Sequence, residues 1–163
     1  MTKENINKII KKYIFEENIG LLSIDIDGND YWIWQAISVI KPDILILEYN
    51  SLFGKERSLT LKYDESFIRP SQGLFRCMYG ASLKALTDLS KVKGYSLVSV
   101  NSNGNNAFYV RNEILNDKIY KKNLDECFKK NTFKEHISSD GEIKKISNTD
   151  LEKILNSEKI QEV

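Results

Sequence analysis

Cysteine is scarce in this sequence, and long apolar runs are missing. Among the 163 residues, Cys77 and Cys127 are too few and too far apart for a disulfide framework or a zinc site. We therefore expect free thiols in a reducing compartment. No apolar stretch reaches the ~18 residues that span a bilayer, and the first residues lack the apolar segment of a signal peptide. These absences predict a cytoplasmic protein without membrane contact.

A charge excess of one sign is also missing. The chain has 24 basic and 23 acidic residues, for a net charge of +1, so its overall charge attracts neither nucleic acid nor an anionic lipid surface. With 41% hydrophobic residues, a chain of this length can form one domain that buries roughly two-thirds of the unfolded surface. We expect no nucleic-acid partner, and any ligand must be recognised by local side chains.

Apolar periodicity predicts an alternation of helices and strands, which is typical of an α/β fold. Residues Ile6–Ile14 have helical spacing, with Thr2 as a candidate cap, and Gly20 is expected to end this region. The turn Asn101–Asn106 predicts an antiparallel hairpin. Further helices are expected at Tyr31–Ile40 and Ala81–Lys93, and strands at Leu21–Ile26, Ile44–Leu47, Tyr95–Val100 and Ala107–Val110.

Two long segments lack this regular pattern. Residues Ser51–Tyr79 are interrupted by glycine and proline, and they predict a long loop over the edge of the sheet where the strands end. Residues after Arg111 are rich in lysine, with one expected helix near the end that carries Leu151, Ile154 and Leu155. This tail is expected to be an accessory segment.

Acidic side chains follow two of the expected strands at the point where each strand ends. The run Leu21–Ile24 has the continuous apolar character of a buried parallel strand, and Asp25 and Asp27 come after it. Glu48 and Asn50 follow the next strand. Because ligands bind at the carboxyl ends of parallel strands in open α/β sheets, these side chains are candidate site residues. Asp25 is the candidate general base, since a carboxylate at such a position can accept a proton from a bound ligand.

A structural role for the same acids is the alternative. Asp27–Asp30 has the composition of a turn whose side chains bond backbone amides, and Asp30 is a candidate helix cap. A hydrogen bond to a helix end would satisfy Glu48 without any function. Asp25 is harder to explain in this way, because a carboxylate at the end of a buried strand needs partners. The nearby aromatic residues are expected to be core residues more often than ligand-stacking groups; they are Tyr31, Trp32, Trp34 and Phe53.

Several motifs together resemble one known family. They are ENIN at Glu4–Asn7 with LLSIDIDGNDYW from Leu21, ILEYNSLFG from Ile46, and YGASLKAL from Tyr79 with GYSLVSVNSNGNNAFYVR from Gly94. Over residues 1–113 the chain resembles the FkbM-like branch of the class I S-adenosylmethionine-dependent methyltransferases. The resemblance implies a Rossmann-like methyltransferase sheet truncated to its C-terminal half, with strands four to seven and a final antiparallel hairpin. Residues 114–163 lie outside it and are expected to form a charged helical tail.

The resemblance also implies an activity and a set of site residues. The activity is transfer of a methyl group from S-adenosylmethionine to a hydroxyl of a sugar or small metabolite. Asp25 and Asp27 would be catalytic, and Glu48, Asn50 and Asn106 would bind the acceptor. The acidic motif further resembles the DxD motif of cation-dependent O-methyltransferases, in which acids and an asparagine hold a divalent ion. Asp25, Glu48 and Asn50 would be the ligands of such an ion here.

The family's first three strands have no counterpart in the matched segments. The chain has no Gly-x-Gly turn of the kind that holds the cofactor, which argues against cofactor binding by this chain alone. The strand Leu21–Ile26 would form an exposed edge, and a second chain or a second copy is expected to cover it. Two alternatives stay open. One is a non-catalytic remnant or interaction subunit, and the other is a phosphatase of the haloacid dehalogenase type. Asp25 and Asp27 resemble that phosphatase motif, although Asn29 stands where such enzymes prefer threonine.

Overall fold

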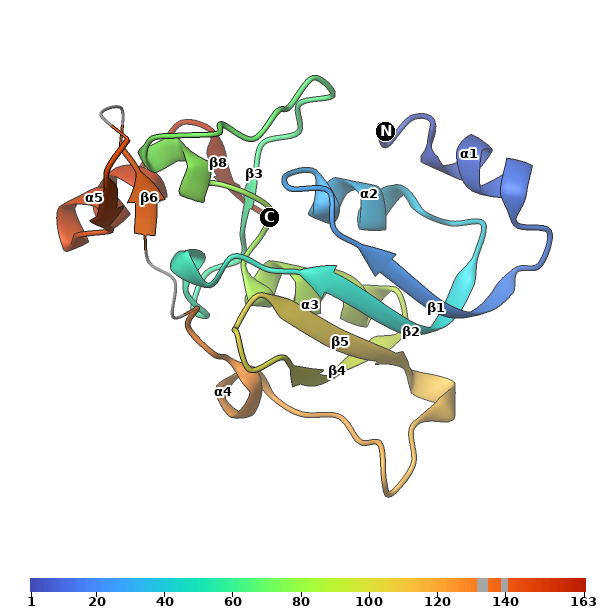
Figure 1. The fold of residues 1–163 in the computed structure, drawn as a ribbon. Helices are drawn as coiled ribbons and strands as arrows, with labels where there is room; N and C mark the ends of the chain where they lie inside the picture. Colours follow the sequence, from blue (N-terminus) through green and yellow to red (C-terminus); the bar gives the residue numbers. More distant parts are fainter. Residues whose placement is uncertain (132–134, 139–140) are drawn as a thin grey trace.

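The computed structural model describes residues 1–131, 135–138 and 141–163 (Figure 1). Within these residues the architecture is mixed α/β. The helices are α1 (Ile6–Tyr13), α2 (Asp30–Ala36), α3 (Leu83–Val92), α4 (Leu124–Cys127) and α5 (Asn148–Leu155). The strands are β1 (Asn18–Ile24), β2 (Lys41–Glu48), β3 (Leu59–Leu61), β4 (Tyr95–Val100), β5 (Asn106–Arg111), β6 (Glu135–Ile137), β7 (Ile143–Lys145) and β8 (Ile160–Glu162).

The main sheet has four strands in the order β1-β2-β5-β4. β1 and β2 run parallel, whereas β5 is antiparallel to both β2 and β4. The predicted parallel pair and the predicted hairpin are therefore both confirmed, and β4 has the predicted bounds. Because the hairpin folds back, the last strand of the sheet in sequence, β5, lies inside the sheet and the preceding strand, β4, lies at its edge (Figure 1).

One face of the main sheet is buried by packing with α2 and α3. Leu45 and Tyr109 have no exposed surface, and they belong to the same apolar core as residues of both helices. Trp34 of α2 packs edge-to-face on Tyr95, with 5.4 Å between the ring centroids, and its Nε1 donates to Ser90 Oγ of α3 at 3.1 Å. Trp34 is thus a core residue that connects α2, α3 and β4.

β1 forms an edge of the main sheet and is not the buried strand that its apolar run predicts. Within the described part of the chain, no strand pairs with its outer edge. Leu21 is 53% exposed, and Ile44, opposite it on β2, is 38% exposed. The prediction of a buried strand was wrong because a run of apolar residues cannot report whether a neighbouring strand is present. The expectation that this strand forms an exposed edge of the sheet is confirmed. Gly20 is also placed inside β1 and does not precede it.

Two helix boundaries differ from the prediction. Asn5, and not Thr2, is the N-cap residue of α1, although the Thr2 carbonyl accepts the Ile6 N–H at 3.0 Å. α2 ends at Ala36, before the predicted end at Ile40, because the chain is already extended at the following residue and turns toward β2. The helix therefore ends several residues before Pro42, which lies in β2 and does not terminate the helix.

The C-terminal tail is not only helical. α5 confirms the predicted helix, but β8 pairs antiparallel with β3, a strand inside the segment predicted to be a loop. Figure 1 shows β8 beside β3, with α5 and β6 farther out on the same side and all three at a distance from β1. Ile154 of α5 is fully buried in a second apolar core. The other members of this core are Phe53, Leu59, Leu61, Cys77 and Met78. The tail therefore folds against the segment between β2 and α3.

Two expectations from composition can be compared with the structure. Cys77 and Cys127 are free thiols, as predicted, and both are buried. Burial raises the pKa of both thiols. Among the described helices, none has both the length and the apolar character that a bilayer span requires.

Gly104 lies where the hairpin turn meets the tail. Its φ is +73°, and a Cβ at this position would lie 2.6 Å from the backbone oxygen of Lys129. Gly54 has the same φ of +73° but no heavy atom within 4 Å of such a Cβ. We predict that Gly104→Ala lowers the free energy of unfolding by ~3 kcal/mol and that Gly54→Ala lowers it by ~1 kcal/mol. Both substitutions carry the cost of a positive φ, but only the first displaces the tail backbone. Urea denaturation measures both values, and equal losses would contradict close packing of the tail on this turn.

Candidate functional site

The turn between β1 and α2 is held by the carboxylate of Asp30. This side chain has no exposed surface and accepts hydrogen bonds from the backbone N–H groups of Ile26 and Gly28, each at 3.0 Å. Burial raises the pKa of Asp30 to about 6, against the lowering effect of these hydrogen bonds. The N-cap residue of α2 is Asn29, and not Asp30 as predicted. Asp30 stabilises the turn that precedes the helix, and this turn contains the candidate acids.

Asp27 lies on this turn in a left-handed conformation, with a φ of 62°. Its carboxylate forms an ion pair with Arg69, from the long segment between β2 and α3. Arg69 also donates from Nε to the Arg76 carbonyl at 3.0 Å, and its guanidinium lies 4.0 Å from the centroid of the Tyr79 ring. The Asp27 side chain is therefore committed to a partner inside the protein.

Glu48 lies at the end of β2 and is 8% exposed. Its Oε2 atom is buried and has no hydrogen-bond partner among the residues that the structure describes. Burial is the largest cause that raises the pKa of Glu48, and the negative charges of Asp25 and Asp30 add to it. Arg69 opposes these effects, and the resulting pKa is about 8. A buried carboxyl group with an unpaired oxygen is costly for the fold alone.

The sheet register aligns three of the candidate residues. Ile24 pairs with Leu47, so Asp25 follows at the level of Glu48, and Glu48 pairs with Asn106 of β5. Side chains at paired positions of neighbouring strands lie on the same face of the sheet. We call Asp25, Glu48 and Asn106 the rim row. Asp25 is exposed and Asn106 is half-buried, so the row is open to solvent beside the buried Glu48.

Asn50 does not point toward the rim row. Its Nδ2 donates to the carbonyl groups of Cys77 and Tyr79, at 2.8 and 3.1 Å, and its Oδ1 accepts the Leu52 N–H at 3.1 Å. Asn50 is 1% exposed and positions the chain before α3. Asn50, Arg69 and Tyr79 are among the residues that line a cavity of about 220 Å³. Arg69 is the residue that also pairs with Asp27.

The residues do not fit the divalent ion that Asp25, Glu48 and Asn50 were expected to hold. The Asn50 amide is engaged within the protein at both ends. In residues 1–131, 135–138 and 141–163, no group of three or more His, Cys, Asp or Glu side chains is arranged to bind a metal. Calcium needs six to eight oxygen ligands and magnesium a near-octahedral set, which these placements do not provide.

Three residues that contact or act on the site were missed by the sequence analysis. Arg69, Tyr79 and Phe67 all come from the segment that was treated as a loop, and no periodic pattern marked them. The Phe67 ring lies where a Cβ of Gly28 would be, so Gly28 allows this segment to pack on the β1–α2 turn. The prediction that this segment passes over the carboxyl end of the sheet is confirmed by these contacts.

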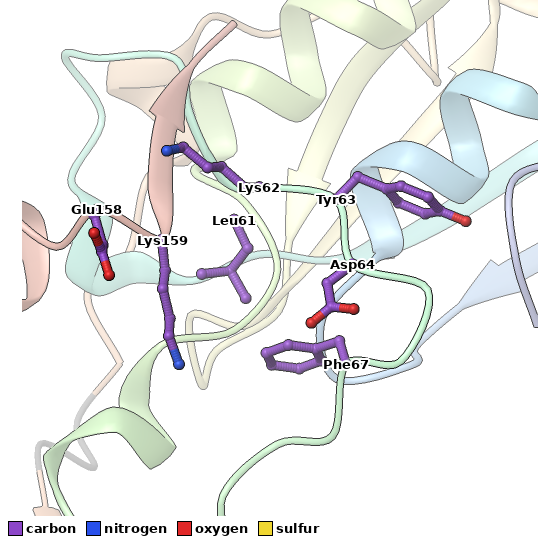
Figure 2. A pocket seen from close by; sticks show the side chains of 7 residues that line it. All are labelled: Leu61, Lys62, Tyr63, Asp64, Phe67, Glu158 and Lys159. Atoms are coloured by element: carbon purple, nitrogen blue, oxygen red, sulfur yellow. The ribbon is translucent and has the colours of Figure 1, made fainter.

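Phe67 also lines a second cavity. Figure 2 shows its lining residues on β3, on the start of the following segment and on the chain before β8. The cavity has a volume of about 320 Å³. Its lining residues include Lys62, Asp64 and Lys159, and no candidate acid of the rim row contributes to it. The Tyr63 hydroxyl nearby donates to the Glu4 carboxylate at 2.6 Å.

Comparisons with family models, with curated proteins and with solved structures find no match to this chain.

The raised pKa of Glu48 makes stability depend on pH. The folded protein holds this proton more tightly than the unfolded chain, so the contribution of Glu48 is complete below its ordinary pKa of 4.5 and is lost as the pH rises through about 8. We predict that Glu48→Gln removes this loss. Between about pH 5 and about pH 9, the wild type should lose on the order of 3 kcal/mol more unfolding free energy than the variant does.

Urea denaturation at the two pH values measures this difference. The matched control is Glu65→Gln, since Glu65 is an exposed glutamate. Parallel pH profiles for the wild type and Glu48→Gln would contradict the burial of an unpaired carboxyl group at this position.

Proposed function

We propose that this chain is the acceptor-binding part of an S-adenosylmethionine-dependent methyltransferase-like domain, which methylates a hydroxyl of a sugar or small metabolite. The rim row carries the proposal, because it places an exposed acid, a buried acid and an amide together at the carboxyl end of a parallel strand pair. The strand arrangement gives further support. β1, β2, β4 and β5 correspond to strands four to seven of the resemblance, and the last two form the implied antiparallel hairpin.

Asp25 is the proposed general base of this reaction. It is exposed at the end of β1, where an incoming hydroxyl can reach its carboxylate. In this role the Asp25 carboxylate would accept the proton of the acceptor hydroxyl, while the methyl group would pass to that oxygen as its bond to the sulfonium sulfur of the donor breaks. Glu48 and Asn106 bind the acceptor beside it and fix the orientation of the attacking oxygen. Asp27, which the resemblance also implies as catalytic, instead holds Arg69 and the segment over the site in place.

The methyl group would come from S-adenosylmethionine. This chain has no Gly-x-Gly turn, so the residues that would hold the methionine and ribose of the cofactor are not provided here. The outer edge of β1 has no pairing partner in the described residues, and Leu21 beside it is exposed. A second chain or a second copy that covers this edge is part of the proposal.

The phosphatase alternative has less support. It needs Asp27 as a free acid and base, and the Asp27 carboxylate is paired with Arg69. The methyl-transfer assay and the cofactor titration described next distinguish the proposal from the alternative of a non-catalytic subunit.

We predict that Asp25→Asn lowers methyl transfer about 10²- to 10⁴-fold while the fold stays intact, because the substitution removes the base and keeps the side-chain shape. The assay follows transfer of a labelled methyl group from S-adenosylmethionine to a panel of sugars and hydroxylated metabolites. Asp117→Asn, at an exposed aspartate of the tail, is the matched control and should retain full transfer.

Isothermal titration of the folded chain with S-adenosylmethionine accompanies this assay. Binding and Asp25-dependent transfer would support the proposal. A folded chain that neither binds the cofactor nor transfers a methyl group, alone or as a dimer, would overturn catalysis by this chain or its dimer and would favour a non-catalytic remnant or a subunit that needs a different second chain.

A further inference from the structure

Two adjoining cavities form an open groove between the C-terminal tail and the segment that follows β3. Their volumes are about 320 and about 110 Å³. Leu61, Asp64, Phe67 and Lys159 line both cavities, so a ligand in one of them reaches the other. We call the two cavities together the tail groove. These volumes are at the lower end of the range for small-molecule sites and suit a ligand about the size of one amino acid better than a nucleotide.

Much of the wall of the tail groove is apolar. Leu61 and Met78 are almost fully buried, and they form the inner part of the wall. Phe67 is half-buried, whereas Ile68 and Phe75 are large apolar side chains that are exposed at the same groove. Exposed apolar side chains that gather around a cavity indicate a surface for an apolar ligand group. An aromatic or branched aliphatic group can pack against the two phenylalanine rings.

Two opposite charges lie beside this apolar wall. Figure 2 shows the Lys159 ammonium group and the Asp64 carboxylate on opposite sides of the Leu61 side chain. Both charged residues are exposed, so a ligand in the groove has access to both. The Lys159 ammonium group lies 5.9 Å from the centroid of the Phe75 ring and has no ion-pair partner among the described residues.

The Asp64 carboxylate is ionised and has one oxygen available. Its Oδ1 atom accepts hydrogen bonds from the backbone N–H and the hydroxyl of Ser66, at 2.9 and 2.6 Å. These hydrogen bonds lower the pKa of Asp64, and the positive charge of Lys159 lowers it further. Neither hydrogen bond uses Oδ2, which can therefore accept one from an ammonium group of a ligand.

We propose that the tail groove binds an α-amino acid with a large apolar side chain, in its zwitterionic form. The carboxylate of the ligand accepts a hydrogen bond from Lys159, and its ammonium group donates one to Asp64. The apolar side chain packs on Phe67 and Phe75. The other charged residues of the larger cavity are Lys62 and Glu158, so its lining has no net charge, as the ligand has none. A ligand with a single charge would meet a like charge at Asp64 or at Lys159.

This inference does not rest on the proposed function, because no residue of the rim row lines the tail groove. β3 and β8 pair beside the groove, so a bound ligand contacts both the segment after β3 and the tail. A ligand that binds only the folded chain stabilises it. Binding should therefore also raise the melting temperature.

The test titrates the 163-residue chain near pH 7 by isothermal calorimetry, with phenylalanine and leucine as the amino acids. Three analogues of phenylalanine each lack one feature. 3-Phenylpropionate lacks the ammonium group, phenethylamine lacks the carboxylate, and alanine lacks the large apolar side chain. We expect phenylalanine to bind about tenfold or more tightly than each analogue, because each missing feature removes a charge-assisted hydrogen bond or the packing on the rings.

Variants at the two charged residues locate the binding. Lys159→Met and Asp64→Asn should each weaken phenylalanine binding about tenfold, since each removes one charge and keeps most of the side-chain volume. Lys121→Met, at an exposed lysine of the tail, is the matched control and should bind phenylalanine as the wild type does. Circular dichroism checks that the variants, all at exposed positions, are folded.

Three outcomes would overturn the inference. The first is no saturable binding of phenylalanine or leucine up to about 10 mM. The second is equal binding of phenylalanine and either singly charged analogue. The third is unchanged phenylalanine binding in folded Lys159→Met and Asp64→Asn, which would place the ligand elsewhere. None of these outcomes bears on methyl transfer, which is measured with other ligands and depends on Asp25.

Discussion

The arrangement of this site depends on one pair of hydrogen bonds, from the backbone N–H groups of Ile26 and Gly28 to the buried Asp30 carboxylate. They close the turn between β1 and α2 around a carboxylate with no exposed surface. Without them, a buried carboxylate would cost several kcal/mol, and the turn would have no fixed shape. The left-handed conformation of Asp27 and the close approach of Phe67 to Gly28 both belong to this turn.

A fixed turn next to β2 brings negative charges together. Asp30 and Asp25 raise the pKa of Glu48, which is already raised by burial, and Arg69 offsets only part of this effect. Arg69 therefore has two roles. It ties the segment between β2 and α3 to Asp27, and it limits the repulsion among the acids. The same segment pairs with the tail through β3 and β8, so the tail stabilises the segment that packs on the site.

Much of the main sheet could be predicted from the sequence because its signals are local. β4, α3 and the hairpin turn follow from apolar spacing and turn residues within short windows, and the proximity of Asp25 and Glu48 follows from two parallel strands that end at one edge. The pairing of β3 with β8 could not be predicted, since each strand has three residues and its partner lies about a hundred positions away. Arg69 was missed for a similar reason, because a long-range ion pair leaves no periodic trace. The apolar run of β1 does not contain the information on which strands lie beside it. The exposed edge was expected only because the matched segments lack a counterpart of the family's first three strands.

The site depends on Glu48 as a buried carboxyl group held among other acids at the carboxyl end of the sheet. The most direct measurement is a titration of the side-chain carboxyl carbons by NMR, with the Glu48 signal assigned by its loss in Glu48→Gln. The account predicts a pKa of about 8 for Glu48. A pKa near the ordinary value of 4.5 would show that this side chain is solvated and unperturbed, and it would contradict the charged site on which the proposed function rests.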